Sequence, residues 1–198
     1  MSNVQKKISE AEDSLELCDL LSAVTESDIQ KLKPLIPDLI ENKYWIVRCD
    51  ILEIIGSFEL SEFLDLVQKR LRDRTILVRL YALTAYYDLL KGKALRVIRQ
   101  FTQDKHVNLR LAALILCYVE TRDEEVLRQI RRIVTRKDCD YHHQYVFLHS
   151  CEDYLDTSKC PEIIQIYRDI LRSIPKSRGV AKDIGKRLKE IRALKMGR

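Results

Sequence analysis

Three of the four histidines lie near cysteines in one stretch of the chain, and both residue types are ligands that Zn²⁺ favours. The spacings match no zinc finger or zinc ribbon, and a helix beginning near Tyr141 would place His142 and His143 on different faces. We therefore expect no metal and no other cofactor. Tyrosines gather in the same stretch, which favours a recognition surface instead. The residues concerned are Cys139, Tyr141, His142, His143, Tyr145, His149, Cys151, Tyr154 and Cys160.

A second set of side chains could bind anions, because eight basic residues fall on the polar sides of three amphipathic segments. Neighbouring helices pack about 10 Å apart, so the set could contact phosphates or an acidic protein along an extended surface. The alternative is a solvated face, partly paired with Glu62, Asp65, Glu124 and Glu125. We call this set the basic band; its members are Lys69, Arg72, Arg96, Arg99, Arg128, Arg131, Arg132 and Arg136.

The C-terminal segment is the most basic part of the chain, with Asp183 and Glu190 as its acidic residues. It could extend a nucleic-acid footprint through salt-sensitive phosphate contacts. The simpler interpretation is a capping helix with a polar outer face, since the ends of repeat arrays need such caps. Its basic residues are Lys176, Arg178, Lys182, Lys186, Arg187, Lys189, Arg192, Lys195 and Arg198.

The elements that carry these residues repeat every 31 residues. Val47-Arg48, Val78-Arg79 and Leu109-Arg110 have this spacing, and Asn42, Asp73 and Asp104 precede them in the same register. Such a short unit cannot bury its own apolar face, so neighbouring units must stack into a continuous core.

Each unit is predicted to be a helical hairpin. First helices, called A, begin near residues 47, 78 and 109; second helices, called B, cover about 60–72, 91–103 and 122–136. We expect turns at Gly56-Ser57, Lys91-Gly92 and Thr121–Asp123, with Ser61 and Thr121 as N-caps. Upstream, 14–24 and KLKPLIPDLIEN form a further pair. Downstream, 141–155 and 161–173 form an atypical fourth unit, followed by a basic helix over 178–195.

This pattern resembles HEAT repeats, over residues 28 to 137 in particular: a proline-interrupted PLIPDLIEN, an Asp or Asn, Val-Arg, then an apolar helix containing small residues. The resemblance implies an all-α fold, a right-handed α-α superhelix (α-solenoid, armadillo-like) of about five helical hairpins whose B helices line the concave wall. It also implies that Arg48, Arg79 and Arg110 form a ladder with Asp73 and Asp104 between neighbouring units. The expected organisation is a polar tail over 1–13, a solenoid over 14–175 and a capping helix over 176–198.

Enzyme classes with this architecture are not favoured. HEAT-like di-iron hydroxylases use paired His-Glu dipeptides, and none of the four histidines is followed by Glu. DNA glycosylases or lyases of this shape are the residual enzymatic alternative, but no constellation of site residues accompanies the single tryptophan, Trp45, whose ring is expected to wedge between repeats. We predict no catalytic residue.

Composition agrees with an independently stable helical protein. The chain has 198 residues, 46% of them hydrophobic, with five Gly and four Pro. Its net charge of +5 is uneven, because residues 1–65 carry six Lys and Arg against 14 Asp and Glu. The six cysteines form no CxxC, and Cys49 and Cys117 fall among apolar residues, which favours reduced thiols used as core filler. No apolar run reaches the roughly 20 residues of a membrane span, so we expect a cytoplasmic monomer without membrane contact.

The sequence therefore predicts a non-catalytic scaffold or adaptor that binds another protein with an acidic surface, through its B-helix face and its fourth unit. A small neutralising protein of the immunity type is one specific form of this expectation. The alternative is a nucleic-acid-binding protein that uses the basic band and the C-terminal helix.

Overall fold

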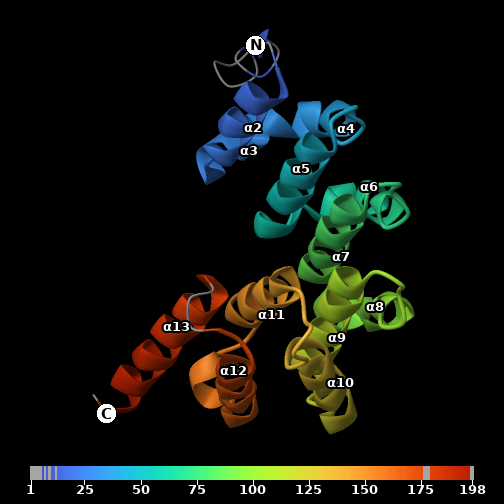
Figure 1. The fold of residues 1–198 in the computed structure, drawn as a ribbon. Helices are drawn as coiled ribbons and strands as arrows, with labels where there is room; N and C mark the ends of the chain where they lie inside the picture. The colour runs from blue at the N-terminus through green and yellow to red at the C-terminus, as the bar shows by residue number, and fades with distance from the viewer. Residues whose placement is uncertain (1–5, 7, 9, 12, 176–178, 197–198) are drawn as a thin grey trace. The chain divides into compact units, whose positions relative to one another are not determined.

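The computed structural model describes residues 6, 8, 10–11, 13–175 and 179–196, and these residues are all-helical with no strand among them (Figure 1). They form two compact units, residues 1–94 and 95–198, and each is described here by itself. Most of the predicted polar tail over 1–13, and Lys176, Arg178 and Arg198 of the basic segment, lie outside the described residues.

The first unit contains two long helices, α5 (Trp45–Ser57) and α7 (Ile76–Leu90), that pack against each other. Helix α2 (Ser14–Ser22) packs on α5, and α6 (Leu64–Arg70) packs on α7. A proline-interrupted series of short helices precedes α5: α3 (Glu26–Leu32), the 3-10 turn η1 (Lys33–Leu35) and α4 (Ile36–Leu39). Pro34 and Pro37 each lie in the first turn of one of these pieces, where the missing N–H costs no hydrogen bond.

The period of 31 residues is confirmed by the helix boundaries. The A helices α5, α7 and α9 (Val107–Thr121) begin at residues 45, 76 and 107. The B helices α6 and α8 (Leu95–Phe101) begin at 64 and 95, after the 3-10 turns η2 (Ser61–Phe63) and η3 (Lys91–Ala94). Fully buried residues anchor the B helices: Val67 in α6, Ile98 in α8, and both Ile130 and Val134 in α10 (Glu124–Val134).

Gly56 was expected to supply a turn, but it lies inside the last turn of α5. A Cβ at Gly56 would lie 3.1 Å from the Ala85 Cα and 3.0 Å from Asp88 Oδ2, so the glycine allows α5 and α7 to approach closely. The turn after α5 lies instead at Glu59, which has a positive φ. The turns expected at Lys91-Gly92 and Thr121–Asp123 are confirmed, with positive φ at Lys91 and Arg122. The expected N-caps are wrong, because the Asp123 side chain caps α10 in place of Thr121, and Ser61 makes no capping bond.

The second unit is built around α9. Helices α8 and α10 pack on α9, and α11 (Tyr141–Tyr154) packs on it as well. The turn η4 (Thr157–Lys159), α12 (Pro161–Ser173) and α13 (Gly179–Met196) complete the unit. α11 begins 34 residues after α9, so the period breaks here, as the sequence predicts.

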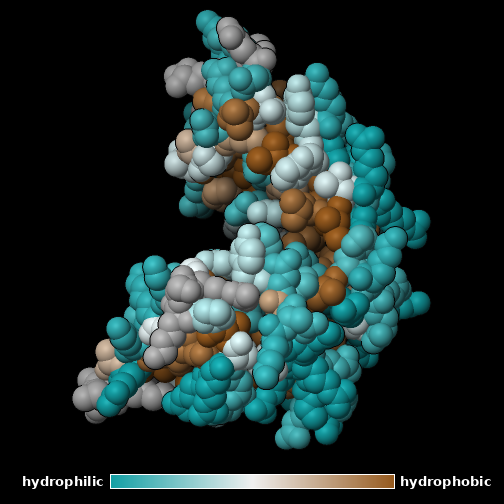
Figure 2. All heavy atoms as spheres, in the orientation of Figure 1, coloured by the Kyte–Doolittle hydropathy of each residue, from teal (hydrophilic) through white to brown (hydrophobic). Residues whose placement is uncertain are grey.

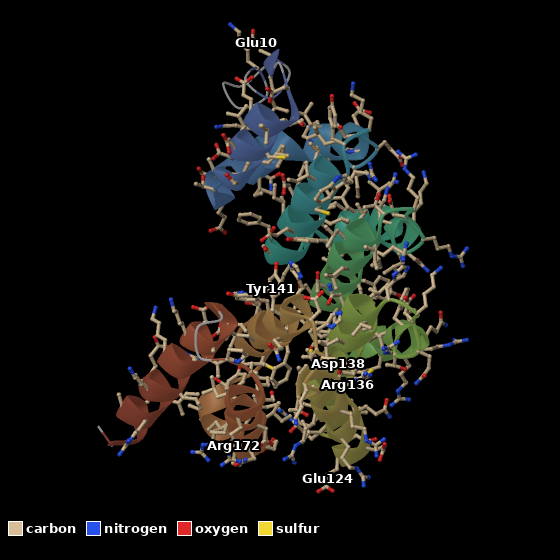
Figure 3. All side chains as sticks on the ribbon, in the orientation of Figure 1. Glu10, Glu124, Arg136, Asp138, Tyr141 and Arg172 are labelled. Atoms are coloured by element: carbon tan, nitrogen blue, oxygen red, sulfur yellow. The ribbon has the colours of Figure 1, made fainter. Side chains whose placement is uncertain are left out.

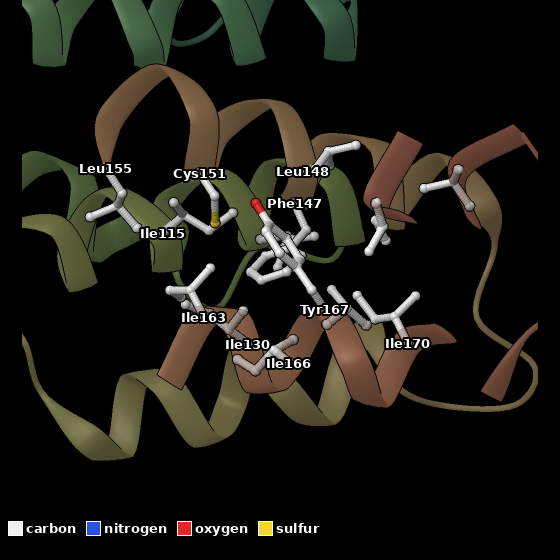
Figure 4. Packing of buried hydrophobic residues seen from close by; sticks show 14 of the residues in the cluster. Ile115, Ile130, Phe147, Leu148, Cys151, Leu155, Ile163, Ile166, Tyr167 and Ile170 are labelled. Atoms are coloured by element: carbon white, nitrogen blue, oxygen red, sulfur yellow. The ribbon is translucent and has the colours of Figure 1, made fainter. Parts of the chain in front are cut away.

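One apolar cluster fills the second unit and joins helices that follow each other along the chain (Figure 4). Phe147 of α11 and Tyr167 of α12 are fully buried and meet edge to face, with ring centroids 5.6 Å apart. Ile115 of α9 and Ile130 of α10 belong to the same cluster. The atypical fourth unit therefore shares one core with α9 and α10 of the preceding repeat unit.

Candidate binding surface

The Asp/Asn and Arg positions of the repeat form the same structure three times, between a B helix and the next A helix. The side chain of Asn42, Asp73 or Asp104 accepts a hydrogen bond from the backbone amide two residues later, at 2.9, 2.8 and 2.8 Å. These amides belong to the N-cap residues Tyr44, Thr75 and His106. This is an Asx turn, which reverses the chain and starts the A helix.

The arginine that follows closes the same loop from the other side. Nη1 of Arg48, Arg79 and Arg110 donates to the backbone carbonyl six residues earlier, at 2.7, 2.8 and 2.7 Å. A guanidinium bound to a carbonyl replaces water with a charge-assisted hydrogen bond. We call these segments, 42–48, 73–79 and 104–110, the loop joints.

Arg48 also makes the ion pair expected of the ladder. Its Nε and Nη2 donate to the two carboxylate oxygens of Asp73, both at 3.1 Å, and both side chains are buried. Burial alone would raise the pKa of Asp73, but the Thr75 amide and the Arg48 guanidinium outweigh it and hold this pKa below its usual value. Asp73 therefore stays ionised and joins two consecutive loop joints of the first unit.

Arg48–Asp73 is the one pair of the expected ladder that the described residues show, because Arg79 and Arg110 donate to backbone carbonyls. The described residues hold no carboxylate partner for Arg110, and Asp138, the counterpart of Asp104 in the next unit, pairs with Arg136 instead. The interpretation of Arg110 as a ladder residue was therefore wrong. The cause is the longer spacing to α11, which moves Asp138 out of the register.

All eight residues of the basic band are exposed, Lys69 and Arg72 in the first unit and the other six in the second. The surface over α6 and over α8 is predominantly hydrophilic (Figure 2). Four members have carboxylate partners: Lys69 with Glu41 at 2.8 Å, Arg128 with Glu125 at 2.7 Å, Arg131 with Asp169 at 2.5 Å and Arg136 with Asp138 at 2.7 Å. Arg136 and Asp138 are labelled side by side in Figure 3.

Two of these ion pairs lower the pKa of the carboxylate that takes part in them. The hydrogen bonds from Lys69 and Arg70 lower the pKa of Glu41, and the one from Arg136 lowers the pKa of Asp138. For the other four members, Arg72, Arg96, Arg99 and Arg132, the described part of the chain provides no carboxylate partner. These four arginines are the members able to bind an external anion without losing an internal pair.

The Cys/His stretch does not assemble a metal site. His142 Nδ1 lies 2.9 Å from Asp140, His143 Nδ1 lies 3.9 Å from Cys139 Sγ, and Cys151 is enclosed in the apolar cluster. Over the ranges that the structure describes, no three His, Cys, Asp or Glu side chains converge to hold a metal ion. All six cysteines are free thiols, and burial raises the pKa of Cys49 to about 12, which agrees with its predicted role in the core.

No family model, curated protein or solved structure matches this chain. Among the described helices, none is both long and apolar enough to traverse a bilayer. Trp45, expected to wedge between repeats, is 43% exposed at the first position of α5.

One group of contacts was missed by the sequence reasoning. Near the start of α12, the Tyr118 hydroxyl donates to Glu162, and Arg122 lies over the Tyr118 ring and donates to Cys160 Sγ at 3.6 Å. The tyrosine-rich stretch that the sequence singled out contributes a row of rings on α11, namely Tyr141, Tyr145 and His149. Their spacing of four residues was a usable signal for the row; the Tyr118 group joins residues more than 40 positions apart and left none.

Proposed function

We propose that this chain is a non-catalytic HEAT-like repeat protein that binds a partner protein with an acidic surface. The observation that carries the proposal is the loop joint, which recurs three times at intervals of 31 residues with matching hydrogen bonds. A repeated joint of this kind supports the α-solenoid expected from the sequence, in which stacked hairpins present an extended wall. Such walls serve many functions, so the side chains exposed on them decide what is bound.

The partner is inferred from the charges on the B helices. Arg96 and Arg99 on α8 and Arg132 on α10 are exposed and have no carboxylate partner in the described residues. Arginine is favoured at protein interfaces because its planar guanidinium binds a carboxylate with two hydrogen bonds. Glu124 and Glu125 share α10 with Arg132, and a surface of mixed sign suits a protein better than a polyphosphate.

The test is a charge reversal of the three unpartnered arginines, R96E/R99E/R132E. A matched control, R128E/R136E/R172E, changes the same number of charges in the same unit, but its arginines already have internal partners. Each protein is used to capture partners from its native cells after nuclease treatment, and the partners are identified by mass spectrometry. We expect a stoichiometric acidic protein with the wild type and the control, and its loss with the first triple variant.

Two outcomes would count against the proposal. Capture that survives R96E/R99E/R132E would place the interface elsewhere on the molecule. Capture that disappears on nuclease treatment would favour the nucleic-acid alternative instead. Circular dichroism of both variants checks that neither has lost its helical structure.

A further inference from the structure

One side of α11 carries a row of three rings, of which the first and third are exposed and the middle one is half-buried against the apolar cluster. Tyr141, Tyr145 and His149 follow each other at intervals of four residues and therefore share one face of the helix. Tyr141 meets Tyr145 edge to face at 6.2 Å, and Tyr145 stacks on His149 at 5.9 Å with an interplanar angle of 11°. Tyr141 is 48% exposed and lies at the start of α11 (Figure 3). We call these three residues the ring platform.

The ring platform is fixed to the neighbouring helix α13. The Tyr145 hydroxyl donates to Asp183 Oδ2 at 3.1 Å. Gly179 begins α13 against the same hydroxyl, since a Cβ there would lie 2.7 Å from the Tyr145 oxygen. α11 and α13 thus lie side by side, as Figure 1 shows, and the rings are held at their common edge.

Beyond that edge α13 presents a row of positive charges. Lys182, Lys186 and Lys189 are exposed and fall on one face of the helix, at intervals of four and three residues. Lys186 follows Asp183 by three residues, so it lies beside the edge that faces α11. We call these three residues the lysine ridge; at 1.5 Å per residue it extends over about 10 Å.

The two carboxylates of α13, Asp183 and Glu190, offset the positive charge of the lysine ridge only in part. Asp183 is engaged by Tyr145, and Glu190 accepts a hydrogen bond from Arg187 at 3.3 Å, while Lys186 approaches Glu190 only to 4.0 Å. Arg187 in turn donates to the buried Thr157 at 3.1 Å. The apolar side of α13, including Ile184 and Ile191, is buried. The helix is therefore anchored, and its outer face keeps a net positive charge.

We propose that this face of α11 and α13 binds single-stranded nucleic acid, with bases stacked on the ring platform and phosphates on the lysine ridge. Flat rings beside cations match a ligand that has aromatic faces and an anionic backbone, whereas an acidic peptide offers only the charge. A duplex keeps its bases stacked inside and cannot place them on Tyr141. This site is separate from the basic band, and the inference does not rest on the proposed function.

The experiment is a fluorescence anisotropy titration of the full chain with labelled 12-nucleotide poly(U) and poly(dT), at two salt concentrations. We expect micromolar binding at low salt that weakens steeply as salt rises. Y141A should weaken binding about ten-fold, because one stacked base contributes about that factor, while Y141F should bind like the wild type. K182Q/K186Q should lower the dependence of log Kd on log salt by about 1.4, because each lysine–phosphate pair contributes about 0.7 to that slope.

A matched control removes two charges of the same unit away from this face. K105Q/R172Q changes exposed residues of the loop before α9 and of α12, and Figure 3 labels Arg172 on a different helix from Tyr141. It should leave the affinity within two-fold of the wild type. Binding that is absent at low salt, that is unchanged in Y141A, or that is equalled by poly-L-glutamate or by duplex DNA would overturn the proposal.

Discussion

The three arginines of the loop joints occupy equivalent positions, but their contributions to folding stability differ with their surroundings. All three donate to a carbonyl six residues earlier, but Arg48 is in addition buried and paired with Asp73 through two hydrogen bonds. A buried pair contributes little beyond its desolvation cost, yet breaking it leaves one charge uncompensated. The same sequence position is therefore more sensitive at Arg48 than at Arg110.

Arg48→Ala should destabilise the protein by about 3 kcal/mol, because it leaves the buried Asp73 carboxylate with Arg70, at 3.3 Å, as its remaining cationic partner. Arg110→Ala is the matched change at the equivalent position and removes a charged hydrogen bond to a carbonyl, for about 1.5–3 kcal/mol. Urea unfolding followed by circular dichroism measures both. Equal losses in the two variants would show that the Arg48–Asp73 pair has no special role.

Asp73 should also give the stability a specific dependence on pH. Its pKa is lower in the folded chain than its ordinary value of 3.8, so its ionised form stabilises the fold above that pH, and this contribution is lost as the pH falls through the folded pKa. Asp73→Asn should therefore be less stable than the wild type at pH 7, and the difference should shrink below about pH 4. Urea midpoints at pH 7, 5 and 3 measure it. A difference that stays constant over this range would contradict the prediction.

At the scale of elements, the contact between α5 and α7 depends on a small residue. Gly56 lies against the backbone of Ala85, and both are buried. Gly185 is the contrasting case within α13, since nothing lies within 4 Å of a Cβ added there. Replacement by alanine should therefore have opposite effects on stability at these two helical glycines.

Gly56→Ala should destabilise the protein, because forcing a methyl group against the Ala85 backbone costs about 1–3 kcal/mol and outweighs the helix preference of alanine. Gly185→Ala should instead stabilise it by up to about 1 kcal/mol, the difference in helix propensity. The melting temperatures of both variants and of the wild type, measured by thermal unfolding, test the two predictions. Stabilisation by Gly56→Ala would mean that α5 and α7 can separate at no cost.

The helices could be predicted from the sequence because apolar residues and the Asx–Arg spacing recur in register. α11 and α12 match the expected 141–155 and 161–173, and α13 matches 178–195. Two of the three turns could be predicted, at Lys91-Gly92 and Thr121–Asp123, whereas the turn at Glu59 could not. The positive φ of Glu59, Lys91 and Arg122, none of them glycine, left no signal in the sequence, because tertiary packing imposes it. Exposure of the basic band followed from amphipathic spacing, whereas the partners of Arg131 and Lys69 come from distant parts of the chain and leave no local pattern.

At the scale of the whole molecule, the chain contains two compact units, 1–94 and 95–198. The second has an apolar cluster centred on Phe147 and Tyr167, drawn from α9, α10, α11, α12 and α13. Local contacts dominate such units, so a defect in one core should act mainly on its own helices.

Phe147→Ala should destabilise the second unit by about 3–5 kcal/mol, through reduced burial and the cavity left behind. Hydrogen exchange should become faster in α9, α11 and α12, while α2 and α5 keep the protection of the wild type. Leu83→Ala, a fully buried residue of α7, is the reciprocal control and should act on the first unit. Uniformly faster exchange in both variants would show that the chain unfolds as one cooperative body.

The loop joint has a consequence for how such a gene can change. Its Asx turn and its arginine-carbonyl bond both close within seven residues, so a duplicated segment of 31 codons would carry a complete connector with it. Unequal recombination could then lengthen or shorten the protein by whole units without inventing a new junction. A change in the number of 31-residue units would therefore be the simplest mutation that changes the length of this protein.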